Sequence, residues 1–247
     1  MGKAITDVDP GAGAVDEEMV SEIAAAFTRH RVRIEVLGCY INPIHPDPEI
    51  RRSLHGRFME HLRHARAFGC GIVALESGSL NGDYSPHPGN HGKEAFQQLV
   101  REMRGLVAVA GDCGVVVGIE AVTSHVVSTP EKMRWLLDEI ASPHLKVVFD
   151  PVNLLNEYNF TFQRDVVHRS LELFGDDIMV VHAKDFRVAG DHYETCPAGS
   201  GMLDYDAFLP WFGQHKPGIT VLLEEAGPEA AGASRQFLMQ SISSIIP

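Results

Sequence analysis

Short runs of apolar residues recur along the chain and predict six buried β-strands. These runs cover residues 32–39, 71–75, 115–120, 146–150, 178–182 and 219–224. The fourth run should stop at Asp150, because Pro151 has no N–H group to donate to a sheet.

Between the strands, apolar side chains recur every three or four residues, which is the period of an amphipathic helix. The predicted helices cover residues 16–30, 47–68, 96–107, 128–140, 162–174 and 206–212, with a last helix that ends near residue 246. Asp16 and Asp47 have the chemistry of N-cap residues, and Ser128 and Glu131 have the spacing of a capping box. Strands and helices that alternate in this way predict a parallel sheet covered by helices.

The sequence favours a closed barrel over an open nucleotide-binding sheet. No Gly-x-Gly-x-x-Gly motif follows the first predicted strand, and no Walker lysine motif is present. A length of 247 residues suits one α/β barrel. We therefore predict a single (β/α)8 TIM barrel over residues 1–247, with all strands ending at the same face.

Only six of the eight strands of such a barrel can be found, with residues 3–8 as a remnant of one more. We expect the barrel to be incomplete at its N-terminus, lacking the first strand and helix and most of the second strand. The open sheet edge that results favours association into a homo-oligomer.

Composition narrows the function classes. A net charge of −12 disfavours nucleic acid as a partner, because nonspecific binding depends on neutralising phosphates. No apolar run approaches the length of a membrane span, and the N-terminus lacks the pattern of a signal peptide, so we expect a cytoplasmic protein without a membrane partner. The four cysteines form no Cys-x-x-Cys pair and are expected to be reduced core thiols.

Four of the predicted strands end in a side chain that can bind a metal ion. These are Glu120, Asp150, His182 and Glu224, separated by 30, 32 and 42 residues, about one strand and helix each. Taken singly, each carboxylate could be a loop or salt-bridge residue, and the histidine a hydrogen-bonded core residue. At one barrel mouth, however, three carboxylates would repel one another unless a cation compensates them. Carboxylates with one imidazole suit Mn²⁺, Mg²⁺ or Co²⁺, with Zn²⁺ as an alternative.

The residues around these positions form four short motifs: Glu120-Ala-Val-Thr-Ser-His125, Phe149-Asp150-Pro-Val-Asn153, Val181-His182-Ala-Lys-Asp185 and Leu223-Glu224-Glu225. These motifs resemble the strand-end motifs of the sugar phosphate isomerase/epimerase group of the xylose-isomerase-like barrels. The resemblance extends over nearly the whole chain. This group is related to ketose 3-epimerases, hydroxypyruvate isomerases, inosose dehydratases and, more distantly, endonuclease IV. The resemblance implies that the four strand-end residues bind one divalent metal and that Glu120 and Glu224 act as acid and base.

The implied function is that of a divalent-metal-dependent isomerase or epimerase of a small carbohydrate, such as a ketose, a sugar phosphate or a polyol. It would transfer a proton through a metal-bound enediolate, with Mn²⁺ the favoured ion. A sugar or inosose dehydratase or lyase at the same site remains open, as does a noncatalytic sugar-binding barrel. A DNA repair nuclease is disfavoured, because Cys39 and Asn153 stand where endonuclease IV has histidines.

Four further residues are candidates for substrate contacts, namely Asn153, Arg187, His125 and Glu76. The first two lie at or near positions where related epimerases contact substrate, and the other two follow predicted strands. Each could instead be an ordinary polar or salt-bridged loop residue.

Two more features follow the His182 strand. Lys184 and Asp185 are expected to pair with each other or with neighbouring loops, in a structural role. The Gly199-Ser200-Gly201 turn lies where many barrels bind phosphate, although glycine turns are common in loops of every kind.

Overall fold

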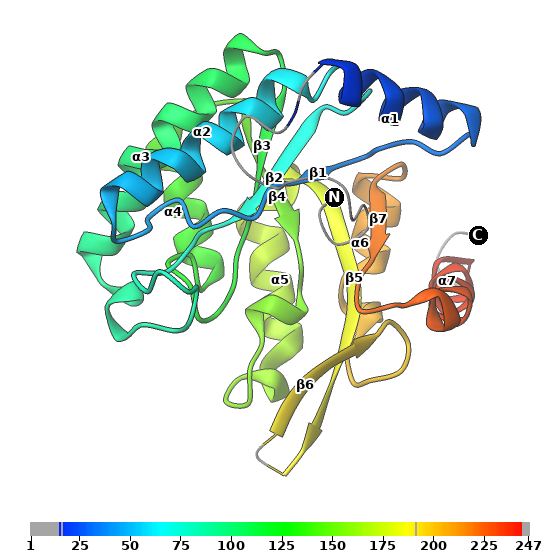
Figure 1. Cartoon of the computed structure of the whole chain (residues 1–247). Coiled ribbons are helices and arrows are strands. Elements are labelled where there is room, and N and C mark those ends of the chain that lie inside the picture. The colour runs from blue at the N-terminus through cyan, green and yellow to red at the C-terminus, as the bar shows by residue number, and fades with distance from the viewer. Residues whose placement is uncertain (1–14, 16, 191, 244–247) are drawn as a thin grey trace. The chain divides into compact units, whose positions relative to one another are not determined.

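The computed structural model describes residue 15, residues 17–190 and residues 192–243 (Figure 1). The chain divides into two compact units. The first comprises residues 1–120, 124–127 and 135–146, and the second comprises residues 121–123, 128–134 and 147–247. Each unit has parallel strands and a core of its own, and the single-domain organisation stays a prediction.

The first unit alternates helices with parallel strands, as predicted. Its elements are α1 (Glu17–Arg29), β1 (Leu37–Gly38), α2 (Pro48–His64), β2 (Ile72–Glu76), the 3-10 helix η1 (Pro88–His91), α3 (Lys93–Asp112) and β3 (Val116–Glu120). Strand β2 pairs in parallel with both β1 and β3. In this register Glu76 lies opposite Glu120, so both side chains leave the same face of the sheet.

The strand predicted over residues 32–39 is wrong for most of its length, because β1 has only two residues. Val32 is 51% exposed. Arg33 and Glu35 form an ion pair with each other at 2.6 Å. Residues 32–36 therefore lie outside the sheet, although their apolar and charged residues alternate as in a strand.

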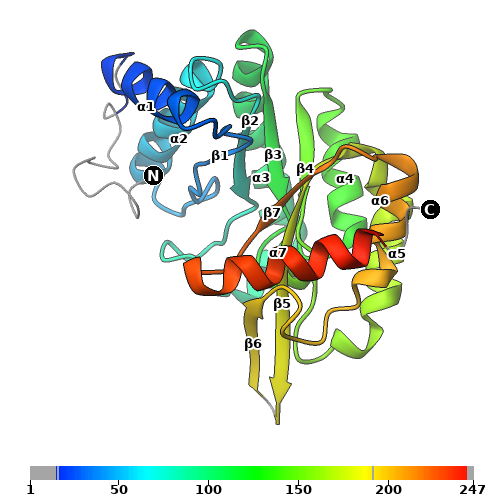
Figure 2. The ribbon, with the colours of Figure 1, turned by 90° about the vertical axis from the view of Figure 1, so that its right-hand side faces the viewer.

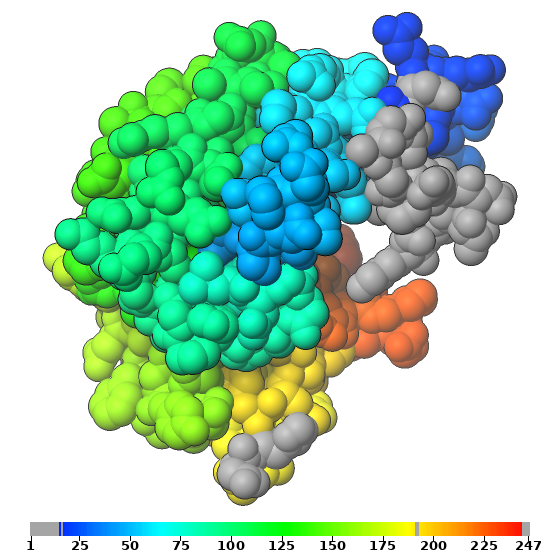
Figure 3. Space-filling view, turned by 60° about the vertical axis from the view of Figure 1, so that its left-hand side comes forward, coloured from blue at the N-terminus to red at the C-terminus, as the bar shows by residue number. Residues whose placement is uncertain are grey.

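The core of the first unit surrounds β2. Val73, Ala74 and Leu75 are fully buried, which is typical of a parallel strand covered on both faces. Helices α2 and α3 lie side by side at the surface (Figure 3). Arg51 Nε of α2 contacts Glu102 Oε1 of α3 at 3.1 Å.

The predicted helix N-termini are confirmed in part. The Asp47 carboxylate accepts two N–H groups of the first turn of α2, at 2.8 and 3.2 Å, as expected of an N-cap. At α4 (Pro130–Ile140) the cap is Thr129 instead of Ser128, since the Thr129 hydroxyl accepts an N–H of the first turn at 3.3 Å. Asp16 lies outside the described residues.

The second unit continues the alternation and adds a hairpin. Its elements are β4 (Leu145–Phe149), η2 (Val152–Leu154), η3 (Phe160–Phe162), α5 (Gln163–Phe174), η4 (Gly175–Asp177), β5 (Ile178–Ala189), β6 (His192–Pro197), η5 (Tyr205–Ala207), α6 (Leu209–His215), β7 (Thr220–Leu223) and α7 (Pro228–Ser243). The part of β4 that belongs to this unit begins at residue 147. Strands β4 and β7 both pair with β5 in parallel.

The β5–β6 hairpin is the largest departure from the sequence prediction, which ended this strand at His182. Strand β5 continues to Ala189, and β6 returns antiparallel beside it, as Figure 2 shows. A turn at Gly190, with a φ of 66°, joins the two strands. Phe186 stacks on Tyr193 with ring centroids 5.0 Å apart, which stabilises the part of the hairpin beyond β4 and β7.

An aromatic cluster forms the helix-facing core of the second unit. The Phe149 ring lies 6.3 Å from Phe174, 6.2 Å from Phe208 and 6.3 Å from Phe212, measured between ring centroids. Since successive strand residues point to opposite faces, Phe149 facing the helices directs the next residue, Asp150, to the other face.

Cys39, Cys70 and Cys196 are buried, as expected of core thiols, whereas Cys113 is half-buried, and the reduced state of the four cysteines stays a prediction. Burial raises the pKa of Cys39 to about 11. This thiol is therefore protonated and unreactive at neutral pH.

Several broader expectations stay predictions. Residues 3–8, the proposed strand remnant, lie outside the described part of the chain.

Among the described residues, six strands form the parallel pairs, and these correspond to the six predicted ones. Within the same residues no helix has the length and apolar character needed to cross a bilayer. Cytoplasmic location and self-association stay predictions.

Candidate metal and active site

Three of the four predicted metal ligands meet in the second unit, at the carboxyl ends of its parallel strands. Asp150 follows β4, His182 lies in β5 and Glu224 follows β7. The backbone N–H of Glu224 donates to Ala183 O at 3.0 Å, which places Glu224 beside His182. Parallel pairing thus brings together residues that are far apart in the sequence.

The three side chains approach one another closely. His182 Nδ1 lies 3.1 Å from Glu224 Oε1 and 3.9 Å from Asp150 Oδ2. Asp150 and His182 are buried, whereas the Glu224 side chain is 33% exposed. Glu224 is therefore the member of this group through which solvent or a substrate can reach the other two.

Asp150 is held rigidly in a turn. Its Oδ1 accepts the backbone N–H groups of Val152 at 2.9 Å and Asn153 at 3.1 Å. The carbonyl of Asn153 in turn accepts the N–H of Thr123 at 2.9 Å. One carboxylate oxygen thus fixes the loop, and Oδ2 faces His182.

Lys184 also belongs to this group: it pairs with carboxylates in the loops that directly follow β4 and β7, as one of the two expected pairings had it, and its partner is not Asp185. Its ammonium lies 2.8 Å from Asp150 Oδ2 and 3.1 Å from Glu224 Oε2, and the residue is 6% exposed. Because β5 continues past His182, the residue two positions later shares its face. That two-residue spacing was the sequence signal for Lys184.

Asp185 has the structural role that the sequence suggested. Its Oδ1 accepts the N–H groups of Phe186 at 2.9 Å and Leu203 at 2.7 Å, and its Oδ2 accepts that of Gly199 at 3.1 Å. A Cβ atom on Gly201 would come within 2.4 Å of Asp185 Oδ1. Gly201 is thus explained by packing against Asp185, whereas Gly199 has a φ of 81° and packs against the Phe237 ring.

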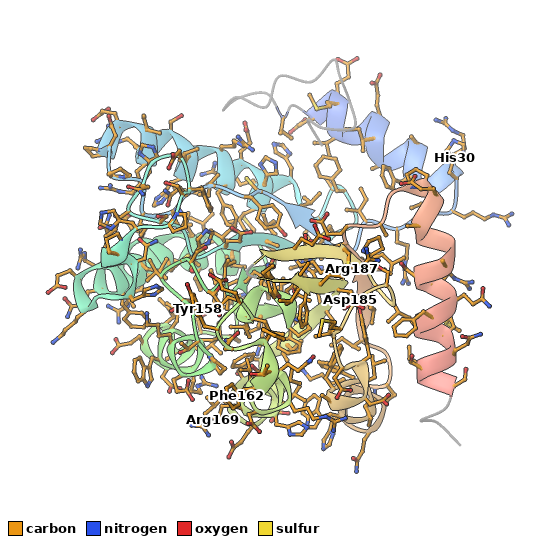
Figure 4. The ribbon with its side chains drawn as sticks, turned by 90° about the horizontal axis from the view of Figure 1, so that it is seen from below. His30, Tyr158, Phe162, Arg169, Asp185 and Arg187 are labelled. Carbon is orange, nitrogen blue, oxygen red and sulfur yellow. The ribbon has the colours of Figure 1, made fainter. Side chains whose placement is uncertain are left out.

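Arg187 lies further along β5, beside Asp185 in Figure 4. It is exposed, and its Nε donates to the carbonyl of Ser200 at 2.8 Å. This contact ties Arg187 to the 199–201 turn. A role in substrate binding stays a prediction.

In the first unit, Glu76 and Glu120 end the neighbouring strands β2 and β3, and His125 lies in the loop after β3. Glu120 is buried at the end of β3, and its Oε2 accepts a hydrogen bond from the Tyr40 hydroxyl at 3.4 Å. Glu76 Oε2 lies 3.3 Å from His125 Nδ1, and the Tyr84 ring packs edge-on to His125 at 5.1 Å. Tyr40 was not identified from the sequence, although it directly follows the first predicted strand.

Burial lowers the pKa of His125 to about 4, so the ring is neutral at pH 7 and its contact with Glu76 is not an ion pair. An unfolded histidine titrates near pH 6.5. Between about pH 6.5 and 4 the unfolded chain therefore binds a proton that the folded chain does not, and stability falls as the pH falls.

We expect His125→Gln to remove this pH dependence. The loss of unfolding free energy between pH 7 and 4.5, measured by urea denaturation, should be smaller by about 2 to 3 kcal/mol than in the wild type. His168→Gln, a change at an exposed position on α5, is the control and should leave the loss unchanged. Equal losses in wild type and H125Q would contradict the assignment.

The residues of the second unit fit a small divalent cation. Asp150 and Glu224 supply carboxylate oxygens and His182 supplies an imidazole nitrogen, which are donors that Mn²⁺, Mg²⁺ and Zn²⁺ accept. The Lys184 ammonium contacts both carboxylates, so the two face a common point where positive charge is favoured. This donor set could hold a metal.

Comparisons with known proteins identify the fold. A family profile described as xylose isomerase-like TIM barrel matches residues 4–241. A D-tagatose 3-epimerase-like protein of known structure has a TM-score of 0.77 at 18% identity, covering 93% of this chain and 84% of its own. A xylose isomerase-like TIM barrel protein from Mycobacterium smegmatis, solved in complex with magnesium, has a TM-score of 0.72 at 13% identity, covering 95% and 81%.

One curated relative is similar in sequence. The 3-oxo-isoapionate decarboxylase of Pectobacterium atrosepticum is 30% identical over 104 residues, which is 40% of this chain and 36% of the relative. The match thus spans about a third of that protein. The family profile, in contrast, spans nearly the whole chain and confirms the predicted fold class, so the chain belongs to the xylose isomerase-like TIM barrel family.

Proposed function

We propose that this protein is a divalent-metal-dependent isomerase or epimerase of a small carbohydrate, such as a ketose, a sugar phosphate or a related polyol. The observation that supports it best is the meeting of Asp150, His182 and Glu224 at the ends of three parallel strands. Membership of a barrel family with an epimerase-like structural neighbour agrees with this proposal.

In this proposal Asp150, His182 and Glu224 hold one metal ion, with Glu120 as the fourth ligand. Glu120 has the matching position, buried at the carboxyl end of its strand. Mn²⁺ is the preferred candidate, and Mg²⁺, Co²⁺ and Zn²⁺ are alternatives. When bound, such an ion polarises a sugar carbonyl and acidifies the neighbouring C–H group.

The two glutamates divide the proton transfer. Glu224 is 33% exposed at its side chain, so it can meet a substrate and act as the base that removes the carbon-bound proton. Glu120 would return a proton, and its hydrogen bond from Tyr40 orients its carboxylate for this step. Return to the opposite face of the same carbon gives epimerisation, and return to the next carbon gives isomerisation.

Four residues are proposed to bind the substrate, namely Asn153, Arg187, His125 and Glu76. The Glu76 and His125 pair offers an acceptor and a neutral ring nitrogen, which suits sugar hydroxyl groups. Arg187 offers exposed N–H donors beyond the one that binds Ser200. The partner is therefore a small polar molecule.

Solvent exchange tests the proposal. We expect a panel of ketoses, inososes and sugar acids, incubated with the protein and Mn²⁺ in deuterated water, to include a compound that gains carbon-bound deuterium. The mass of that compound, measured by mass spectrometry, should rise by one unit, and the incorporation of deuterium should require added metal. Lack of exchange with every compound would contradict an isomerase or epimerase.

A lyase is the second candidate, and the similarity to a 3-oxo-isoapionate decarboxylase favours it. Loss of CO₂ from a 3-oxo acid leaves an enolate, so the same residues could serve. The panel distinguishes the two, since a decarboxylase releases CO₂, a dehydratase releases water, and both change product mass. A noncatalytic sugar-binding barrel would bind a compound without changing it.

A further inference from the structure

The Lys184 ammonium occupies the position between two proposed metal ligands. It lies 2.8 Å from Asp150 Oδ2 and 3.1 Å from Glu224 Oε2. Lysine is rarely buried unless paired, and Lys184 is 6% exposed. Two carboxylates share this one cation.

The surrounding strand fixes the direction of Lys184. Strand β5 pairs with β7 up to Ala183 and with β6 from Lys184 onward. The carbonyl of Lys184 accepts the Tyr205 hydroxyl at 2.9 Å. Strand pairing and this hydrogen bond therefore fix the backbone of Lys184. Only its side chain can move, by changing rotamer.

The charges in this group do not favour a lysine and a divalent ion together. Asp150 and Glu224 each carry one negative charge, and His182 faces both of them. With Lys184 present, the two carboxylates already have a partner. A divalent ion must compete with the ammonium for the same oxygens and is repelled by it at short distance.

We propose that Lys184 is a positioning residue that takes the cation position between Asp150 and Glu224 in the metal-free protein and gives up these carboxylates when a divalent ion binds. This inference rests on the proposed metal site. Lys184 keeps the buried Asp150 carboxylate compensated before metal enters, and it lowers metal affinity by competition. The metal site is then preformed, and binding exchanges one cation for another.

Lys184→Met tests the proposal, because methionine keeps the length and apolar stem without the charge. In isothermal titration with MnCl₂ alone, K184M should bind Mn²⁺ with a Kd lower by about tenfold or more than the wild type. In EDTA its Tm should fall by about 10 °C, since Asp150 then lacks a partner. Saturating Mn²⁺ should remove most of this difference in Tm.

Two further variants keep the test decisive. Lys132→Met removes a lysine of the same unit whose ammonium contacts the Ser128 hydroxyl at 3.1 Å, and it should leave the Mn²⁺ affinity unchanged. Lys184→Arg keeps the charge and should retain a Kd near that of the wild type. If K184M folds only with Mn²⁺ present, that dependence supports the proposal. If it does not fold at all, the K184R titration is compared with the wild type alone: an equal Kd supports the proposal, and a Kd lower by about tenfold or more overturns it.

The outcomes separate this inference from the proposed function. Wild-type protein that binds no Mn²⁺ would overturn the metal site and the inference together. Wild-type binding with an unchanged Kd in K184M would overturn the inference alone. A Kd for K184R as low as that of K184M would also overturn it, because the charge would then have no part in the competition.

Discussion

Replacing Asp150 by asparagine should abolish tight metal binding, with a loss in Mn²⁺ affinity of more than about 100-fold by isothermal titration. The asparagine side chain keeps a carbonyl oxygen that can accept the two backbone N–H groups of the turn, which Oδ1 of Asp150 accepts in the wild type. The change therefore removes the charge of a proposed ligand and keeps its local structure. Asp150→Ala should lose binding as well, together with the turn.

Asp185→Asn is the matched control for this loss. Asp185 is a second buried aspartate, one strand position from Lys184, and both of its oxygens accept backbone N–H groups outside the metal cluster. Its variant should lose stability and keep the Mn²⁺ affinity of the wild type. Equal binding by D150N and wild type would remove Asp150 from the site.

Glu224→Gln should lower kcat on the identified substrate by about 10² to 10⁴ at saturating Mn²⁺, because glutamine cannot accept the carbon-bound proton. The glutamine side chain keeps the size of Glu224 and can still lie beside His182 Nδ1, which is 3.1 Å from the carboxylate in the wild type. Its exposure on the solvent side explains why this residue, among the three of the second unit, is proposed as the base.

The neighbouring Glu225 provides the control. It is exposed and follows Glu224 directly, so Glu225→Gln changes the same type of side chain outside the cluster. E225Q should keep the wild-type kcat. A wild-type rate in E224Q would assign proton removal to another residue. Wild-type protein that binds a sugar but does not convert it would favour a noncatalytic binding protein.

The resemblance of a few strand-end motifs predicted the fold class and the composition of the second unit's cluster. Asp150 could be placed at the end of its strand because the apolar run 146–149 precedes it and Pro151, which cannot donate to a sheet, follows it. Apolar patterning reports which residues are buried, and strand ends follow from it. The alternation of β-strands with helices was therefore readable from the sequence in both units.

Elements whose formation depends on distant partners were not predicted. Residues 32–36 have a strand-like apolar pattern but lie outside the sheet, with Val32 exposed. Strand β5 runs seven residues beyond the predicted end, from His182 to Ala189, because β6 returns to pair with it. Local propensity does not specify such pairing, which is decided by long-range hydrogen bonds and by contacts such as Phe186 on Tyr193.

The sequence by itself determined that acidic and imidazole side chains stand at strand ends, because that order is encoded in consecutive residues. Tertiary structure alone decided that the Lys184 ammonium lies between Asp150 and Glu224, while its neighbour Asp185 fastens the 199–203 turn. The physical reason is strand alternation: once pairing extends β5, adjacent residues point to opposite faces, and only one of the two can reach the carboxylates.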